Sequence, residues 1–160
     1  MKRLLLVLLG LTLLLGACGA SQAVRPSALD RDSVLPLEHV SRMAGCDMKL
    51  AYDHRDDRKG MAIWAWEEAQ GPSRLLYVEI YLPAADPDGR YEAAEQRSQV
   101  LSAPQGMQAC GDGRSVHLRF GGYAARVVEM GALADEKALA LLQQCLLDNL
   151  PVLESKTKED

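Results

Sequence analysis

The sequence has no surplus of positive charge. Its 160 residues include 18 Lys and Arg against 22 Asp and Glu, which gives a net charge of −4. This balance argues against nucleic acid as a partner, because nucleic-acid binding depends on clustered Lys and Arg. It also argues against a polybasic attachment to anionic lipid head groups.

Several motifs that carry chemistry are also missing. No two cysteines have CxxC spacing, which argues against redox catalysis and zinc, and no serine lies in a Gly-x-Ser-x-Gly elbow. The acidic segments 53–57 and 86–89 are typical of solvated turns, and Ala84 stands where a calcium loop would need its first Asp. We therefore expect no metal, no cofactor and no enzymatic activity.

No apolar run is long enough to cross a membrane as a helix. The run at residues 4–15 follows Lys2-Arg3 and precedes Gly16-Ala17, whereas a spanning helix needs roughly 20 apolar residues. A positively charged start, a short apolar segment and small residues at its end are typical of a secretory signal. The sequence therefore predicts an exported protein.

The end of this segment, Leu15-Gly16-Ala17-Cys18, resembles the lipobox of bacterial lipoproteins. The resemblance covers only residues 1–18, and we identify no family for the rest of the chain. It implies that residues 1–17 are a signal peptide and that Cys18 is lipidated, with two or more acyl chains giving a stable attachment. The alternative is an ordinary signal cut near Ala17 or Ala20, which leaves Cys18 unmodified.

The resemblance also implies a location in the cell envelope. In lipoproteins of double-membraned bacteria, Asp directly after the lipidated Cys favours the inner membrane, and this chain has Gly19 there. We therefore expect anchoring to the outer membrane, with the protein facing the periplasm. Residues 18–35 are predicted to be the lipidated Cys and a flexible tether, residues 36–153 a single compact domain, and residues 154–160 a charged tail.

The remaining cysteines are Cys46, Cys110 and Cys145. An exported protein meets an oxidising compartment, so one disulfide is expected. Cys145 lies in an apolar stripe of helical spacing, where a free thiol can be buried as a small apolar group. We therefore favour a Cys46–Cys110 bridge, and Cys145 remains an alternative partner for either.

Alternation of apolar and polar residues predicts a sheet. The pattern indicates strands at 48–52, 61–67, 74–82, 107–110, 115–120 and 123–130, after a short helix at 36–44. Residues 83–89 are predicted as a loop, and 91–103 remain undecided between helix and strand. A C-terminal helix follows Asp135 and ends at Pro151. The predicted fold is α+β, an antiparallel sheet of five or six strands with the C-terminal helix packed on one face.

Four aromatic side chains form the candidate binding face. Tyr77 and Tyr81 lie opposite the aliphatic face of the strand at 74–82, and we place Trp64 and Trp66 of the neighbouring strand beside them. Tyr and Trp are enriched where proteins bind one another. The alternative is that a second layer, built from 36–44 or 91–103, covers these rings.

The expected function is non-catalytic binding of a partner protein or an envelope component near the anchoring membrane. A first alternative is a small-molecule or lipid carrier, with an apolar pocket of about 300 Å³ or more between sheet and helix. A second alternative is a small envelope enzyme, which would need His54 or His117 gathered with acidic groups. The identity of the partner and the oligomeric state do not follow from the sequence.

Overall fold

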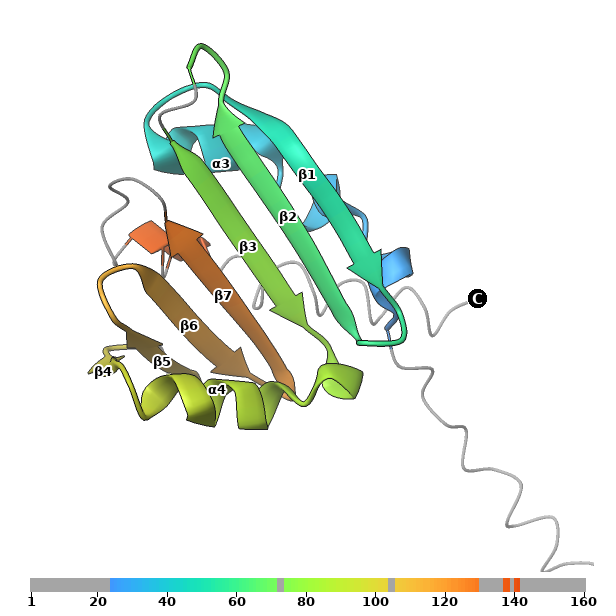
Figure 1. The fold of residues 1–160 in the computed structure, drawn as a ribbon, viewed down its shortest axis with the longest axis vertical. Helices are drawn as coiled ribbons and strands as arrows, with labels where there is room; N and C mark the ends of the chain where they lie inside the picture. The colour runs from blue at the N-terminus through green and yellow to red at the C-terminus, as the bar shows by residue number, and fades with distance from the viewer. Residues whose placement is uncertain (1–23, 72–73, 104–105, 130–136, 139, 142–160) are drawn as a thin grey trace, which may run out of the picture.

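The computed structural model describes residues 24–71, 74–103, 106–129, 137–138 and 140–141. Within these residues, seven antiparallel strands form one sheet in the order β1-β2-β3-β7-β6-β5-β4 (Figure 1). The strands are β1 (Met48–Asp56), β2 (Met61–Glu68), β3 (Leu75–Tyr81), β4 (Gln99–Leu101), β5 (Gln108–Gly111), β6 (Ser115–Phe120) and β7 (Tyr123–Glu129). The helical elements are η1 (Pro26–Ala28), α2 (Arg31–Val34), α3 (Leu37–Ala44), η2 (Pro83–Ala85) and α4 (Pro87–Glu95).

The α+β class and the antiparallel sheet are confirmed, but the predicted number of five or six strands is too low. The additional strand is β4, which has three residues and pairs with β5 at one edge of the sheet. Three residues are too few to show an alternation of apolar and polar side chains, so the sequence pattern could not predict this strand. The undecided segment 91–103 contains both the end of α4 and β4.

One face of the sheet, which we call the core face, carries the hydrophobic core. Trp64 of β2 lies opposite Val78 of β3, and both are fully buried. Trp66 lies opposite Leu76 in the same register. On the other half of the sheet, Val116, Leu118, Ala125 and Val127 continue this apolar surface.

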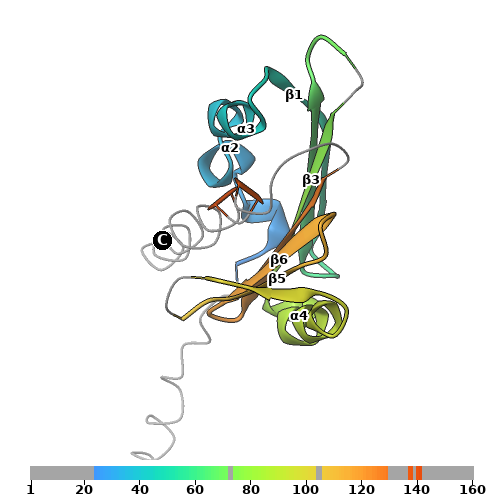
Figure 2. The same cartoon turned by 90° about the vertical axis from the view of Figure 1, so that its left-hand side faces the viewer.

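The N-terminal helical segments cover the core face. Leu29, Val34, Leu35 and Val40 are fully buried in the same cluster as the tryptophans, and Val24 is 8% exposed. Figure 2 shows α2 and α3 on one side of the sheet and α4 on the other. Residues 24–35 therefore belong to the folded domain, which corrects the prediction of a flexible tether for this part of 18–35. The helix predicted at 36–44 is confirmed as α3.

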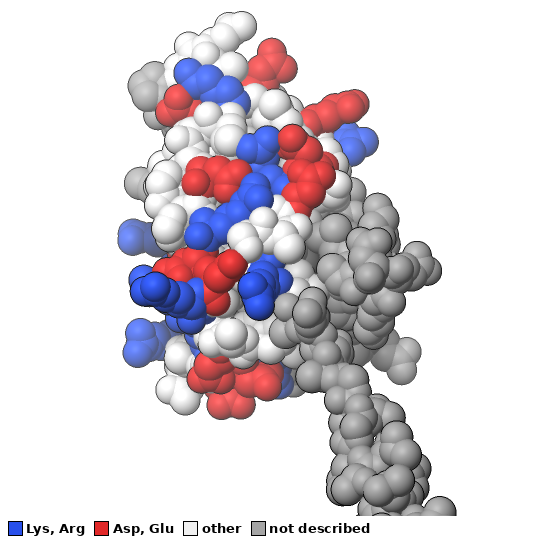
Figure 3. Space-filling model, turned by 90° about the vertical axis from the view of Figure 1, so that its right-hand side faces the viewer, with Lys and Arg blue, Asp and Glu red and all other residues white. Residues whose placement is uncertain are grey.

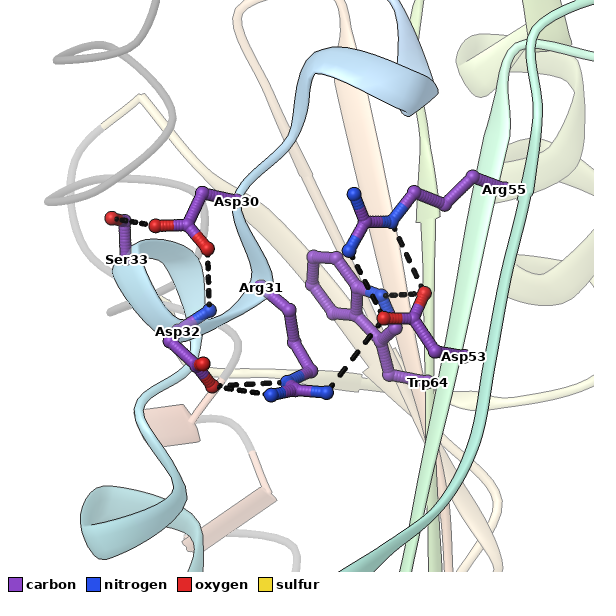
Figure 4. Close-up of polar contacts among 7 residues, drawn as sticks. All are labelled: Asp30, Arg31, Asp32, Ser33, Asp53, Arg55 and Trp64. Carbon is purple, nitrogen blue, oxygen red and sulfur yellow. Dashed lines mark hydrogen bonds and ion pairs between the residues drawn. The ribbon is translucent and has the colours of Figure 1, made fainter.

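A polar cluster fastens α2 to β1 (Figure 4). The Asp53 carboxylate accepts a hydrogen bond from Nε1 of the buried Trp64 at 3.0 Å and one from Nε of Arg55 at 3.1 Å. Arg31 of α2 approaches the same carboxylate at 3.7 Å. The cluster satisfies the indole N–H, which would otherwise be buried without a partner.

The opposite face, which we call the second face, is covered in part by α4. This helix contacts β5, β6 and β7, and its Tyr91 is 2% exposed. It begins at Asp86, whose side chain accepts a hydrogen bond from the backbone N–H of Gly89 at 3.2 Å. The loop predicted at 83–89 is therefore wrong from Pro87 onward, because Asp at the N-cap and Pro at the first helical position also start a helix.

Two further core residues come from the C-terminal part of the chain. Residues 137–138 and 140–141 are helical, and Ala138 and Leu141 are fully buried in the cluster that contains Trp64. The rest of the predicted C-terminal helix and the charged tail at 154–160 lie outside the described residues. Residues 1–23, which include the predicted signal peptide and Cys18, also lie outside them.

Strand β1 forms one edge of the sheet and carries charges of both signs. Lys49 pairs with Glu67 of β2 at 3.1 Å, and Arg55 pairs with Asp53 at 3.0 Å. Figure 3 looks onto this side of the molecule and shows basic and acidic side chains interspersed. The register also shifts between Leu50 and Tyr52. Charged side chains and such irregularities discourage other strands from adding to an edge.

Candidate functional site

Only half of the second face is covered by a described element. Helix α4 lies over β5, β6 and β7, and Ala85 of η2 packs with Met61 and Tyr81 at one end of β2 and β3. The rest of this side of β1, β2 and β3 is not covered by a helix of the described residues (Figures 1 and 2). We call the second face of these three strands the open half. Ile63, Leu75 and Tyr77 are half-buried there, and Tyr52 is 45% exposed and stacks on His54.

A pocket of about 450 Å³ lies where α4 meets the open half, and we call it the α4 pocket. Its polar lining comes from β3, α4 and the turn after it, and β6 and β7: Tyr81, Arg90, Arg97, Ser115, His117 and Arg126. Ala93 and Ala94 add a small apolar wall, and Asp112 is the acidic residue of the lining. Three arginines thus line one pocket together with one acidic residue.

Helix α4 and strand β3 hold the first side of the pocket. Nε of Arg90 donates to the carbonyl oxygen of Ala85 at 2.7 Å, and the guanidinium carbon lies 4.6 Å from the centre of the Tyr81 ring. The Tyr81 hydroxyl donates to the carboxylate of Glu79. Burial raises the pKa of Tyr81, and this hydrogen bond to Glu79 raises it further. Tyr81 therefore stays a protonated donor at neutral pH.

The turn between β5 and β6 holds the second side. Oδ1 of Asp112 accepts hydrogen bonds from the backbone N–H groups of Arg114 at 2.9 Å and Ser115 at 2.7 Å. The Ser115 hydroxyl lies 3.2 Å from the same oxygen. These bonds, the one from Arg114 first, lower the pKa of Asp112. The carboxylate is therefore ionised, and its Oδ1 accepts hydrogen bonds from within its own turn.

His117 and Arg126 lie opposite each other in the β6–β7 register and form the floor. Burial lowers the pKa of His117, and the neighbouring Arg126 lowers it further, so the imidazole is neutral at pH 7. A terminal nitrogen of Arg126 lies 3.4 Å from the Glu79 carboxylate. Its Nε is buried and has no hydrogen-bond partner among the described residues.

The contacts of Ser115 do not follow the order of a catalytic triad. In a triad the carboxylate orients the imidazole, and the imidazole accepts the proton of the hydroxyl. Here Asp112 contacts the Ser115 hydroxyl itself, which also lies 3.3 Å from Nε2 of His117. Arg126 beside the ring disfavours the imidazolium that a general base forms. The described contacts of Ser115 therefore differ from those of a triad nucleophile.

The four aromatic residues of the predicted binding face do not share a face. Trp64 and Trp66 are fully buried on the core face, because they lie opposite Val78 and Leu76 in the register. Tyr77 lies on the second face within the open half, and Tyr81 is 7% exposed in the α4 pocket. The placement of the two tryptophans beside the tyrosines is thus corrected.

The predicted Cys46–Cys110 disulfide is absent from the structure. Both thiols are free, because Cys46 precedes β1 and Cys110 lies on β5, with β2, β3, β7 and β6 between these strands. A disulfide needs Cα atoms within about 7 Å of each other. Cys110 is buried, and this burial raises the pKa of its thiol. Cys18 and Cys145 lie outside the described residues.

The three histidines lie far apart in the fold. His54 of β1 and His117 of β6 are separated by β2, β3 and β7, and His39 lies on α3. Within the described part of the chain, no group of three His, Cys, Asp or Glu side chains could hold a metal ion. His117 instead contacts Ser115, a pairing that the sequence analysis did not predict.

The arginines of the α4 pocket were not predicted as site residues. Arg97 lies in the segment 91–103, whose conformation was undecided, and Arg90 lies between this segment and the predicted loop at 83–89. Arg126 alternates with apolar residues like any residue of a half-solvated strand. The only available signal was that Arg126 and His117 fall on the polar sides of adjacent predicted strands. To place the two side chains opposite each other, the register between β6 and β7 must be known, and the sequence pattern does not give it.

No family model matches the chain, and no match is found among the curated proteins or the solved structures. None of the helices in the described ranges is both long and apolar enough to cross a membrane.

Proposed function

We propose that the protein is a lipid-anchored protein of the bacterial cell envelope, and that its domain binds a partner protein or another envelope component without catalysis. The observation that carries the proposal is the second face. Its open half presents half-buried apolar side chains beside a pocket where three arginines converge. Apolar area next to a few fixed polar groups is typical of binding sites.

The proposed anchor is a lipid on Cys18. A positively charged start, the apolar run at 4–15 and the small residues before Cys18 support it. Gly19 supports sorting to the outer membrane by the resemblance to lipoproteins of double-membraned bacteria. The mild negative charge of the chain leaves lipid, rather than basic side chains, as the membrane contact.

The proposal includes the finer prediction for the fold, a C-terminal helix on the core face. Burial of Ala138 and Leu141 in the core cluster supports this position. A helix there would complete the covering of the core face by η1, α2 and α3. The second face would then remain the side available to a partner.

Carriage of a small anion is a second candidate function. The α4 pocket, at about 450 Å³, exceeds the volume of about 300 Å³ that we expect of a carrier. Its lining is mainly polar, however, which suits an anion and not an acyl chain. Release of a bound small molecule on denaturation of the purified protein, detected by mass spectrometry, would favour this function over partner binding.

The anchor is tested by labelling cells with radioactive palmitate. We expect the wild-type chain to take up label and to fractionate with the outer membrane. The Cys18→Ser variant should take up none and keep its leader. A wild-type chain without label, or with an uncut leader in mass spectrometry, contradicts the proposed anchor.

Binding is tested by capture of partners from solubilised membranes with variants of the open half. Ile63→Ser and Tyr77→Ser each remove apolar area from this surface, and we expect both to lose a partner that the wild-type chain captures. Leu37→Ser is the matched control, because Leu37 of α3 is 41% exposed away from the second face. Equal capture by all three variants contradicts binding at the open half. A large fall in melting temperature of Tyr77→Ser alone would assign that ring to core packing.

A further inference from the structure

The fold brings three arginines to one pocket. Arg90 lies on α4, Arg97 follows this helix, and Arg126 lies on β7. Like charges gathered in one pocket repel one another unless acidic groups or a ligand compensate them.

Acidic side chains compensate only part of this charge. Glu79 lies 3.4 Å from Arg126 and also accepts from Tyr81, so its charge is shared. Asp112 accepts three hydrogen bonds within its own turn. Arg90 and Arg97 form no ion pair with any described residue. The α4 pocket is therefore left with a positive excess.

Arg90 and Arg126 are held in position by contacts within the protein. The bond from Nε of Arg90 to Ala85 and the Tyr81 ring beneath its guanidinium fix this side chain. Nε of Arg126 is buried, and no described residue accepts a hydrogen bond from it. A ligand would therefore contact the accessible part of this side chain, which is 36% exposed, and not Nε.

The chemistry of the lining selects the kind of anion. Guanidinium groups match the oxygens of carboxylate and phosphate with paired N–H donors. Several guanidinium groups favour a doubly charged group with three oxygens over a singly charged carboxylate. The Ser115 hydroxyl and the neutral His117 ring add two neutral polar groups at the same pocket.

We propose that the α4 pocket binds the phosphate group of an organic phosphate. A pocket of about 450 Å³ has room for more than one inorganic phosphate ion, and Ala93 and Ala94 leave space beside the arginines for an organic substituent. This proposal rests on the proposed binding function and names the ligand chemistry of the same site. The phosphate could belong to a soluble monoester or to a lipid head group, and the experiment separates these sources.

The test is calorimetric titration of the full chain, solubilised in dodecyl maltoside, with three probes. Ethyl phosphate represents a soluble monoester, and dihexanoylphosphatidylglycerol represents a lipid head group in monomeric form. Succinate carries the same charge as ethyl phosphate on two carboxylates. We expect at least one phosphate probe to bind, and to bind about tenfold or more tightly than succinate.

Variants assign the binding to the pocket. Arg97→Gln and Arg126→Gln should each weaken phosphate binding by about tenfold or more, because each removes a charge-assisted donor. Arg114→Gln is the matched control, since Arg114 is exposed in the neighbouring turn and does not line the pocket. It should change the affinity by less than about twofold, because exposed charges interact weakly through water. If Arg126→Gln unfolds, the exposed Arg97→Gln still decides the test.

Three results would overturn the proposal: binding of neither phosphate probe, equal binding of succinate, or equal weakening by Arg114→Gln. A preference for one phosphate probe identifies the source of the group. Failure here leaves palmitate labelling and partner capture unaffected, so it is distinguishable from failure of the proposed function.

Discussion

At the scale of single residues, the Asp53 carboxylate joins three parts of the chain. It accepts from the buried indole of Trp64, pairs with Arg55 on its own strand and lies 3.7 Å from Arg31 of α2. Its removal leaves the indole N–H buried without an acceptor and removes the contact with Arg31 of α2. One side chain thus links the N-terminal covering layer to the sheet.

We predict that Asp53→Ala lowers the free energy of unfolding by about 1–3 kcal/mol, the penalty for a buried donor without a partner. Asp32→Ala is the control, because the Asp32 side chain is 63% exposed and pairs with Arg31 at the surface. An exposed pair of this kind contributes at most about 1 kcal/mol. Urea unfolding followed by tryptophan fluorescence measures both variants, and equal losses would contradict the assigned role of Asp53.

His117 makes stability depend on pH. Burial and Arg126 lower its pKa in the folded protein below the unfolded value of about 6.5. The unfolded chain therefore binds the proton more readily. The contribution of His117 to stability is complete above about pH 6.5 and is lost as the pH falls below it.

We therefore predict that His117→Gln flattens the dependence of unfolding free energy on pH between about pH 7 and 5. Some dependence should remain, because burial also lowers the pKa of His39. Urea midpoints at several pH values test this. A slope as steep in the variant as in the wild type would show that His117 does not carry the effect.

At the scale of elements, the start of α4 depends on one residue with two tasks. Asp86 caps the helix through the Gly89 N–H and has a φ of 52°, in the left-handed region. Asn and Asp tolerate this region better than other residues with a side chain. The position of α4, and with it one wall of the α4 pocket, follows from this residue.

We predict that Asp86→Ala destabilises the protein by about 2 kcal/mol, because it removes the cap and places a Cβ in the left-handed region without compensation. Asp86→Asn keeps both properties and should lose no more than about 0.5 kcal/mol. Thermal unfolding of the two variants provides the comparison. Equal losses would mean that the charge, rather than the cap and the backbone, is what stabilises the helix start.

The strands were predictable where one face is apolar and the other polar. This holds for β3 and β6, in which alternation located both the strand and its apolar face. For β7 the preceding Gly-Gly turn located the strand, and no face was assigned. In β2 both faces are largely apolar, so the pattern could not assign Trp64 and Trp66 to a face. The register between β2 and β3 determines the face on which the two tryptophans lie. Register depends on both strands, so the pattern of one strand cannot predict it.

The candidate site was less predictable than the strands. Tyr77 and Tyr81 were correctly placed opposite the aliphatic side of β3, because that assignment needs only the strand's own period. The three pocket arginines come from different elements, and only the folded sheet brings them together. Sequence patterns report local periodicity and therefore miss sites assembled across elements.

At the scale of the whole molecule, the N-terminal segment is part of the domain. Leu29, Val34 and Leu35 are fully buried on the core face. Burial of each such side chain contributes about 1.5–3 kcal/mol, so the three together approach the total stability of an ordinary domain. A flexible tether would contribute none of this.

We predict that a chain beginning at residue 36 loses cooperative unfolding, whereas a chain beginning at residue 22 retains it. Urea titration followed by the fluorescence of Trp64 and Trp66 distinguishes the two. Similar unfolding midpoints for both chains would show that residues 24–35 behave as a tether after all. Both unfolding measurements use the purified chain alone.

With a lipid on Cys18, the packing of Val24 would limit the distance between the domain and the bilayer. Val24 lies beside Pro83 and Ala84, at the end of the sheet from which α4 starts. Only residues 19–23 would then link the lipidated Cys18 to Val24, and a fully extended linker of this length spans about 20 Å. Such a protein could not reach across the periplasm, so its partners would have to diffuse within or close to the same leaflet.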